Sequence, residues 1–551
     1  MRGFRGDFVF GAVAAYAPSF EFAVSDEELS APLVQVHARC LVRLLIILTR
    51  VIYKSLRVPA RMIVGEVIAG SFEGIVAREK DGSNVEVGEL LVSVGDPSLI
   101  VQVTGIEYAS QLSQQNRELI AGLRLEDEAE LNFFDRSLRT YTVLSLKLLA
   151  ELSDGEVRVA KRLPAMFSVL RRITDEDVSL VVSQGDLFAG MVRSGSRVLE
   201  TPLRLDSQAV LSHHVLVAAQ TGKGKSNLMK CILADALENR SVGVLVLDPH
   251  DEYFGRKDLG LKDLASSDLL YFSGSDHPRA QPLRFRIDEL KPRHFDGVAS
   301  FSQAQHEAIA SFRRKHRDGW IDALLSADDD SFHEATLQVL KRRFSNLLSI
   351  APDGSPRGIF VRESSSLAGI LSALEDGKTV VIDTSLFAGA HELLIGSIIT
   401  SEVFDRYRSY KQRGIMKPQI SIVIEEAPRV LGKSVLAHGS NAFDRVAREG
   451  RKFGVGLVAI TQVPSLIQRE ILANMNTKIV LGLEMALERN AIIESAAQDI
   501  SDLSGAIASL EKGEAIITSS FVRFPMPVKM PLFSSLVPSR DHPEVGSKVS
   551  F

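Results

Sequence analysis

The sequence predicts an α/β fold in which a small β-barrel precedes a mainly parallel sheet covered by helices. Two observations predict this architecture. Residues 62–108 carry short strand patterns broken by glycine-containing turns, a spacing typical of a small barrel. Further along the chain, continuous apolar runs alternate with helical patterns, and such runs form parallel sheets that are covered on both faces.

The barrel region is predicted over residues 62–200. Its first part contains the strand patterns "MIVGEVI", "FEGIVAR", "NVEVGELLVSV" and "LIVQVTGIEY". Apolar residues at helical spacing then predict helices over residues 111–152, in "LNFFDRSLRTYTVLSLKLLAEL". Strand patterns resume in "EVRVAKRLP" and "FAGMVRSGSRVLETPLRLD". The helices are therefore expected to be an insertion in the barrel or a flank of it.

The sheet region is predicted over residues 201–290 and 376–535, followed by a tail over 536–551. Its apolar runs occupy residues 214–219, 242–248, 379–383, 419–426, 455–462, 477–483 and 514–519. Residues 291–375, between the second and third runs, have a polar helical pattern. We expect them to form a helical insertion at the rim of the sheet.

The N-terminal segment holds the only membrane-like stretch of the sequence. Its longest uncharged run, residues 44–49, is far shorter than the ~20 apolar residues of a spanning helix. We therefore expect no membrane span and a cytoplasmic location. Strand patterns begin abruptly at Met62, so Met62 is the expected native start, and residues 1–61 are expected to be an upstream misread or a dispensable arm.

Composition excludes several classes of protein. With 551 residues, 45% hydrophobic and 24% charged, the chain is globular and long enough for about two or three domains. Its two cysteines cannot build a disulfide framework or a cysteine-based metal cluster, and they suit a reducing compartment. The formal net charge of -5 gives no overall basic field for nucleic acid, although a local basic channel is compatible with it.

A phosphate-binding loop is predicted in "VLVAAQTGKGKSN", residues 215–227. A buried-strand pattern precedes it and a helical pattern follows, so backbone N–H groups and a helix N-terminus can converge on phosphate. Lys225 would reach the β- and γ-phosphates, and Ser226 would ligate Mg²⁺. Ala219 replaces the usual first glycine, which matters only if that position needs a positive φ. The predicted nucleotide-binding residues of the loop are Thr221, Gly222, Lys223, Gly224, Lys225, Ser226 and Asn227.

Acidic residues follow two of the predicted strands. In "SIVIEEAP", Glu425 is assigned to Mg²⁺ and its water shell, and Glu426 to polarising the attacking water. The alternative interpretation is a solvated pair of acids that caps a helix. Asp248 follows the neighbouring strand in "VLVLDPHDEY" and is assigned to the nucleotide.

Two further groups follow or precede the strand "GLVAIT". Thr461 and Gln462 lie at its end, where Gln462 is suited to sensing the γ-phosphate by hydrogen bonding. The preceding segment "DRVAREGRKFG" is rich in cations, and for most of them a solvated basic helix face explains the charge as well as catalysis does. These cations are Arg445, Arg448, Arg451 and Lys452.

Taken in order, "AAQTGKGKSN", "LVLDPHDEY", "IVIEEAPR", "REGRKFGVGLVAITQVP" and "GEAIITSS" resemble the HerA family of DNA-translocating ATPases, within the HerA/FtsK group of P-loop NTPases. The resemblance covers residues 62–529 and implies a RecA-like P-loop ATPase core, with the barrel matching the family's N-terminal β-barrel. The chain departs from the family pattern at Ala219 and at Asp251, where the family generally has glycine. Neither departure removes a catalytic group.

The resemblance also implies an assembly and a partner. Such proteins form hexameric rings that move along double-stranded DNA beside a NurA nuclease, in DNA end processing and recombinational repair. They hydrolyse ATP with Mg²⁺ between adjacent subunits, where an arginine completes the site. The "GRKFG" string makes Arg451 the candidate, because an arginine binds the spread charge of a phosphoryl transition state well. Whether it serves its own nucleotide or a neighbour's is left open by the sequence.

Two alternatives are weighed against this reading. One is a conjugation-type or defence-associated ATPase that pumps protein or DNA, and the lack of a convincing membrane anchor argues against a secretion machine. The other is a silent scaffold that uses the fold for binding only. Retention of a complete set of catalytic groups argues against the scaffold, the set being Lys225, Ser226, Glu425, Glu426 and Gln462.

Overall fold

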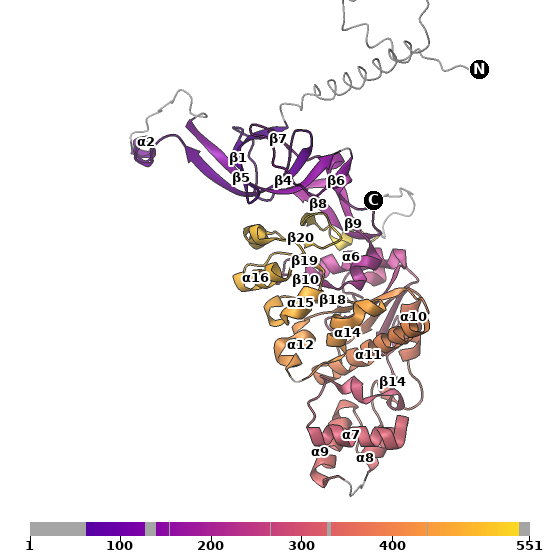
Figure 1. Cartoon of the computed structure of the whole chain (residues 1–551). Coiled ribbons are helices and arrows are strands. Elements are labelled where there is room, and N and C mark those ends of the chain that lie inside the picture. The colour runs from indigo at the N-terminus through magenta and orange to yellow at the C-terminus, as the bar shows by residue number, and fades with distance from the viewer. Residues whose placement is uncertain are drawn as a thin grey trace, which may run out of the picture. The chain divides into compact units, whose positions relative to one another are not determined.

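The computed structural model describes residues 62–126, 139–153, 155–264, 266–327, 332–437 and 439–538 (Figure 1). The predicted extension over residues 1–61 lies outside the described residues, as does the tail from residue 539 onward. The expected start at Met62 therefore stays a prediction.

The N-terminal region is an antiparallel barrel, as predicted. Its strands hydrogen-bond in the order β2-β1-β7-β3-β4-β5, and β2 also pairs with β5, which closes the sheet on itself. β6 pairs with the last residues of β5, Glu151–Ser153, beyond the part of β5 that pairs with β2. Side chains such as Val101, Leu144 and Leu170 fill the interior. The strands are β1 Ile63–Gly70, β2 Ile75–Glu79, β3 Leu90–Ser93, β4 Ser98–Ser110, β5 Thr140–Ser153, β6 Glu156–Arg158 and β7 Val169–Arg172.

The helical prediction for residues 111–152 is wrong over its second half. Within the described part of this range, Gln114–Glu126 forms the helix α2, whereas Thr140–Ser153 is the long strand β5, paired with β4 along its length. The apolar residues of β5 also occur at helical spacing, but the buried ones, Leu144, Leu146 and Ala150, lie two or four residues apart, as on one face of a strand. Pairing with β4 decides the outcome, as tertiary context does for ambiguous apolar segments.

The second sheet contains strands at all of the predicted apolar runs, and the last of them, Glu514–Thr518, is antiparallel to its neighbours. Its order is β13-β12-β16-β11-β17-β18-β10-β19-β20-β21-β8-β9. The strands from β13 to β19 are parallel, and those from β20 to β9 are antiparallel. The strands are β8 Leu187–Ser194, β9 Arg197–Leu205, β10 Val215–Ala218, β11 Val242–Asp248, β12 Leu269–Ser273, β13 Gln281–Pro282, β16 Thr379–Asp383, β17 Gln419–Ile424, β18 Val455–Thr461, β19 Thr477–Val480, β20 Glu514–Thr518 and β21 Met526–Lys529.

Residues 187–200 were expected in the barrel, but β8 and β9 belong to the large sheet. β8 pairs with β21, with Val192 opposite Val528. A short alternating strand has the same sequence pattern in either sheet, so the sequence does not identify its neighbour. A hydrogen bond from the Leu90 amide to the Ser194 hydroxyl (2.8 Å) links this edge to the barrel.

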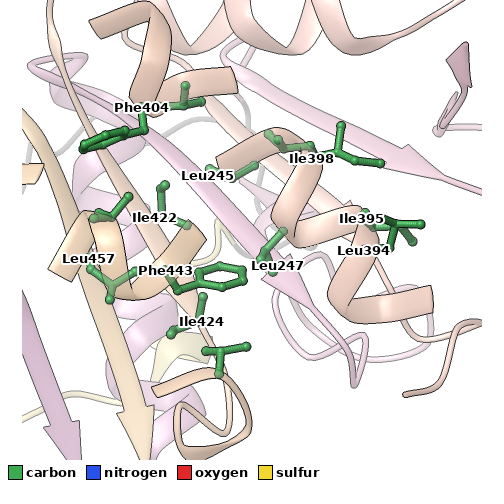
Figure 2. Packing of buried hydrophobic residues seen from close by; sticks show 14 of the residues in the cluster. Leu245, Leu247, Leu394, Ile395, Ile398, Phe404, Ile422, Ile424, Phe443 and Leu457 are labelled. Atoms are coloured by element: carbon green, nitrogen blue, oxygen red, sulfur yellow. The ribbon is translucent and has the colours of Figure 1, made fainter. Parts of the chain in front are cut away.

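Both faces of the parallel sheet are buried. Along β11, Leu245 and Leu247 belong to one apolar cluster, while Val244 and Val246 belong to another. The first cluster includes side chains of α11, Ala390–Arg413, and of α14, Ala442–Glu449, with Phe443 beside the strands (Figure 2). The second includes the buried face of α6, Lys225–Asn239. This alternation is what a strand covered on two sides requires.

The remaining helices are short, apart from those of the insertion. None of the described helices combines the length and apolarity needed to cross a bilayer. The short helices are α4 Asp175–Val181, α5 Ser207–Ser212, α10 Leu367–Glu375, α12 Pro428–Leu431, α13 Lys433–Leu436, α15 Arg469–Asn474, α16 Ala486–Ser495 and α17 Ser504–Ser509.

The predicted helical insertion contains α7 Gln303–His316, α8 Trp320–Ser326 and α9 Glu334–Leu347. Trp320 is fully buried at its centre, packs edge-on against Phe344 with ring centroids 5.4 Å apart, and donates its indole N–H to the Leu290 carbonyl (2.8 Å). The last predicted helix of the block, α10, packs instead against β11 and β16 of the sheet.

A half-buried carboxylate anchors the start of this insertion to the sheet domain. One oxygen of Glu402, on α11, accepts hydrogen bonds from Lys291 (2.6 Å), Arg293 (3.0 Å) and His294 (3.0 Å). Burial alone would raise the pKa of Glu402, but the hydrogen bonds from His294, Lys291 and Arg293 and the charge of Lys291 hold it well below the usual range. Glu402 is therefore ionised and neutralises the cations that gather around it.

Replacing Glu402 with alanine should lower the free energy of unfolding by roughly 1–3 kcal/mol, because Lys291 loses its counter-ion and the buried His294 loses its hydrogen-bond partner, although Arg293 keeps Asp405. Asp288→Ala is the matched control, since Asp288 and its partner Arg286 form an exposed pair. It should change the free energy of unfolding by less than about 0.5 kcal/mol. Urea denaturation followed by circular dichroism measures both. Equal losses in the two variants would contradict the anchoring role.

Candidate nucleotide-binding site

The predicted site residues follow strands that are neighbours in the sheet. β11, β17, β18 and β10 lie side by side in that order and run parallel. Ala218 at the end of β10 is paired with Thr461, and Ile424 at the end of β17 is paired with Leu247. Their carboxyl ends therefore share one edge, which is where open α/β sheets bind ligands.

The loop after β10 turns through two glycines directly into the helix α6. Gly222 and Gly224 adopt φ values of 81° and 104°, which glycine tolerates best, and α6 begins at Lys225. Ala219 is buried, lacks a positive φ, and donates its N–H to the Thr461 carbonyl (3.2 Å). The alanine thus continues the strand, and its substitution for glycine imposes no backbone strain.

Lys225 and the two glutamates interact electrostatically. Burial lowers the pKa of Lys225, against the opposing charges of Glu425, Glu426 and Glu252. Burial also raises the pKa of Glu425, and the like charges of Glu252 and Glu426 act in the same direction. The structure therefore gathers one cation and three carboxylates in a partly desolvated space at the sheet edge.

Gln462 connects the loop to Glu426. Its side-chain oxygen accepts a hydrogen bond from the Thr221 hydroxyl, and its side-chain N–H donates to Glu426 (3.1 Å). Glu426 itself has a φ of 46°, a left-handed conformation that is uncommon outside glycine and concentrates at functional sites. Gln462, which follows β18, therefore contacts both the phosphate-binding loop and Glu426.

Asp248 lies at the predicted edge and is almost fully buried. Its two carboxylate oxygens accept the backbone N–H groups of Glu252 and Tyr253, each at 3.0 Å. Burial raises its pKa, and these hydrogen bonds oppose the rise. Asp248 therefore shapes the following loop, and contact with a nucleotide remains a prediction.

Two predicted nucleotide-binding side chains are engaged elsewhere. Asn227 donates to the Pro531 carbonyl (2.8 Å) and accepts the N–H of Phe533 (2.8 Å), and Lys223 donates to the Leu510 carbonyl (3.0 Å). Both side chains attach the loop and its helix to the chain around β20 and β21. Spacing within the loop could not reveal these distant partners.

Arg451 is far from the other site residues of its own chain. It precedes β18, whereas Gln462 follows it, and seven strand residues span roughly 20 Å. Its charge also acts on His213 and His214, which precede β10. Burial, with smaller effects of His213 and Arg451, lowers the pKa of His214 to about 4. Arg451 thus lies at the amino-terminal end of the strands, opposite the loop.

Of the neighbouring cations, Arg445 and Arg448 have partners within the chain. Arg448 donates to Asp444 (2.6 Å) and Gln468 (2.7 Å), and Arg445 donates to Ser401 (3.2 Å). The Arg451 side chain is exposed and makes no hydrogen bond or ion pair with another described residue. It is therefore free to contact a molecule outside this chain.

The predicted Mg²⁺ ligands fit that ion by their chemistry. Ser226 follows Lys225 directly, and Lys225 lies within the electrostatic influence of Glu425, so a hydroxyl and a carboxylate belong to the same small region. Mg²⁺ prefers such hard oxygen donors and uses only one or two of them, together with phosphate and water. Tyr253 and Glu252, which the sequence did not single out, also reach this region.

Comparisons with known proteins agree with the motif resemblance. The family model described as "Helicase HerA, central domain" matches residues 188–403. The chain is 25% identical over 500 residues to "DNA double-strand break repair helicase HerA" of Sulfurisphaera tokodaii, covering 85% of this chain and 89% of the relative. The protein of that name from Saccharolobus solfataricus is 26% identical over 514 residues, covering 88% and 95%. The predicted resemblance to the HerA family is confirmed.

Among solved structures, the bacterial conjugative coupling protein TrwBdeltaN70 matches with a TM-score of 0.43 and 15% identity, covering 65% of this chain and 93% of that chain. VirB4 of Thermoanaerobacter pseudethanolicus has a TM-score of 0.43 and 13% identity, covering 64% and 97%.

Lys225→Ala should abolish nucleotide binding or turnover, because it removes the cation that would bind the terminal phosphates. Ala219→Gly should change turnover only a few-fold, because the alanine already has an ordinary strand conformation. ATP binding and phosphate release measure both effects. Normal hydrolysis by Lys225→Ala would show that this loop is not the site.

Proposed function

We propose that this chain, a relative of the HerA helicases, hydrolyses ATP with Mg²⁺ and uses the energy to move along double-stranded DNA. One observation carries the proposal. The phosphate-loop cation Lys225, the acids Glu425 and Glu426, and the amide of Gln462 gather at one edge of a parallel sheet. A cation, a pair of acids and a polar sensor are the groups that phosphoryl transfer to water requires.

The chemical roles follow from these positions. The loop amides and Lys225 bind the phosphates, and Ser226 with Glu425 would hold Mg²⁺, which supplies charge neutralisation when bound. Glu426 orients the attacking water and accepts its proton. Gln462, hydrogen-bonded to both Thr221 and Glu426, links the phosphate loop to the acid that activates water.

Arg451 is proposed to complete the site of a neighbouring subunit. Within one chain the length of β18 separates it from the loop, and the side chain is exposed without a partner among the described residues. An arginine supplied in trans stabilises the charge of the phosphoryl transition state. A homo-hexameric ring would bring this end of one sheet against the loop end of the next.

The DNA substrate rests on the relatives, which are named as helicases of DNA double-strand break repair. A NurA-like nuclease partner and a role in DNA end processing and recombinational repair follow from the same relationship. The pumping ATPase and the silent scaffold are the alternatives. The hydrogen-bonded arrangement of Gln462, Thr221 and Glu426 supports a working site over a scaffold.

The test is ATP hydrolysis by the purified chain with and without linear duplex DNA. Duplex should raise the rate, and duplex binding should weaken steeply as salt increases, because contacts to phosphates release counter-ions. The binding should show little preference for sequence, since phosphate contacts carry little base information.

Three outcomes are distinguishable. Equal ATPase rates with and without duplex, together with no salt-sensitive binding, would favour a pumping ATPase that moves protein. No hydrolysis under any condition, with ATP still bound, would favour the scaffold. Stimulation by duplex supports the translocase.

A further inference from the structure

Tyr253 contacts the candidate site from inside the protein. It follows Asp248 by five residues, in the loop after β11, and its side chain is completely buried. Its hydroxyl donates a hydrogen bond to Oε1 of Glu425. A buried hydroxyl that donates to a carboxylate fixes the direction of that carboxylate, since such charge-assisted hydrogen bonds are short and directional.

The backbone around Tyr253 is held by Asp248. Because the two oxygens of Asp248 accept the N–H groups of Glu252 and Tyr253, the loop turns back over the end of β11. The next residue, Phe254, stacks on Tyr271 of β12 with ring centroids 3.8 Å apart and an interplanar angle of 5°. The hydrogen bonds to Asp248 and the stacking of Phe254, the next residue, therefore fix the position of Tyr253.

The loop also carries an ion-pair network. Asp251 adopts a φ of 55°, the left-handed conformation that explains the glycine usual at this place, and its carboxylate pairs with Arg256 (2.8 Å). Arg256 in turn pairs with the buried Asp383 at the end of β16 (3.3 Å) and donates to Ser385 (2.8 Å). The aspartate at residue 251 therefore adopts an unfavourable left-handed backbone conformation, but it forms an ion pair with Arg256 that a glycine could not form.

The same network reaches the aromatic pair. Asp383 accepts hydrogen bonds from the Tyr271 hydroxyl (3.1 Å) and from Ser273 (2.7 Å). The ring that stacks on Phe254 is therefore attached to the carboxylate that pairs with Arg256. Ionic and aromatic contacts, joined through Asp383, together hold the loop between β11 and β12.

We propose that Tyr253 is a positioning residue that holds Glu425 in the orientation needed for Mg²⁺ and water, and that the Asp251–Arg256–Asp383 network keeps Tyr253 in place. The inference rests on the proposed ATPase function and deepens it. Tyr253 acts only through Glu425, because its side chain is completely buried and cannot itself contact a bound nucleotide. The hydroxyl, and not the ring, carries the role.

Tyr253→Phe removes that hydroxyl and keeps the packing. In the full chain, the kcat for ATP should fall about tenfold or more, as expected for a lost hydrogen bond to a buried carboxylate, while KM changes less than about threefold. The Mg²⁺ concentration that gives half-maximal ATP binding should rise several-fold, which equilibrium binding of labelled ATP measures without turnover. Tyr407→Phe is the matched control, since Tyr407 is also buried and its hydroxyl donates to the Pro418 carbonyl (2.6 Å). It should leave both quantities unchanged.

A double-mutant cycle separates positioning from general support of the fold. In a Glu425→Gln background, Tyr253→Phe should not shift the Mg²⁺ dependence of ATP binding further, because its target is already altered. An additional shift equal to that in the wild-type background would overturn the proposal. Wild-type values for Tyr253→Phe in both assays would overturn it too.

If thermal melting shows that Tyr253→Phe does not fold, a second variant, Asp251→Asn, tests the same proposal. Asp251→Asn keeps a residue that tolerates the left-handed conformation and removes the charge that pairs with Arg256. It should lower kcat several-fold and raise the Mg²⁺ requirement in the same assays, and unchanged values would contradict the network's role. If the wild-type chain binds no ATP, the proposed function fails. If it hydrolyses ATP normally and the variants match it, only this inference fails.

Discussion

The parallel alignment of four neighbouring strands is the constraint on which the candidate site depends. β11, β17, β18 and β10 all end at the same edge, so residues more than two hundred positions apart in sequence are within hydrogen-bonding reach. Thr221 and Gln462 meet for this reason alone. The strands remain aligned because both of their faces are buried against helices, which leaves no freedom to slide in register without exposing apolar side chains. Chemistry at the edge is therefore a consequence of packing in the core.

The same alignment divides the site residues into two groups. Residues that follow a strand join the loop, and Arg451, which precedes one, is placed at the opposite end of the sheet. A single chain thus holds a cation, acids and a polar sensor together but lacks the arginine near them. The proposed ring resolves this incompleteness, because head-to-tail contacts bring opposite ends of identical subunits together. In the proposed ring, ATP hydrolysis therefore depends on assembly, because β18 separates Arg451 from the phosphate-binding loop of its own chain.

The parallel strands and the edge that carries the candidate site could be predicted from the sequence. The apolar runs mark the strands, and the residues that follow these runs mark the carboxyl-terminal edge, because both features follow from local sequence patterns. The strand β5 was mistaken for a helix because its apolar spacing suits both periods, and β8 and β9 were given the wrong sheet because a strand does not encode its neighbour. The partners of Asn227 and the role of Tyr253 depend on contacts across the fold, which no local pattern contains.

The most direct test of the shared site is the activity of mixed assemblies. Arg451→Ala and Glu426→Gln should each be nearly inactive alone, since loss of an arginine supplied in trans can cost about 10³-fold or more in rate. Co-assembled, some interfaces combine an intact Glu426 from one subunit with an intact Arg451 from the next, so part of the ATPase activity should return. A mixture shown to co-assemble that stays inactive would contradict a shared site.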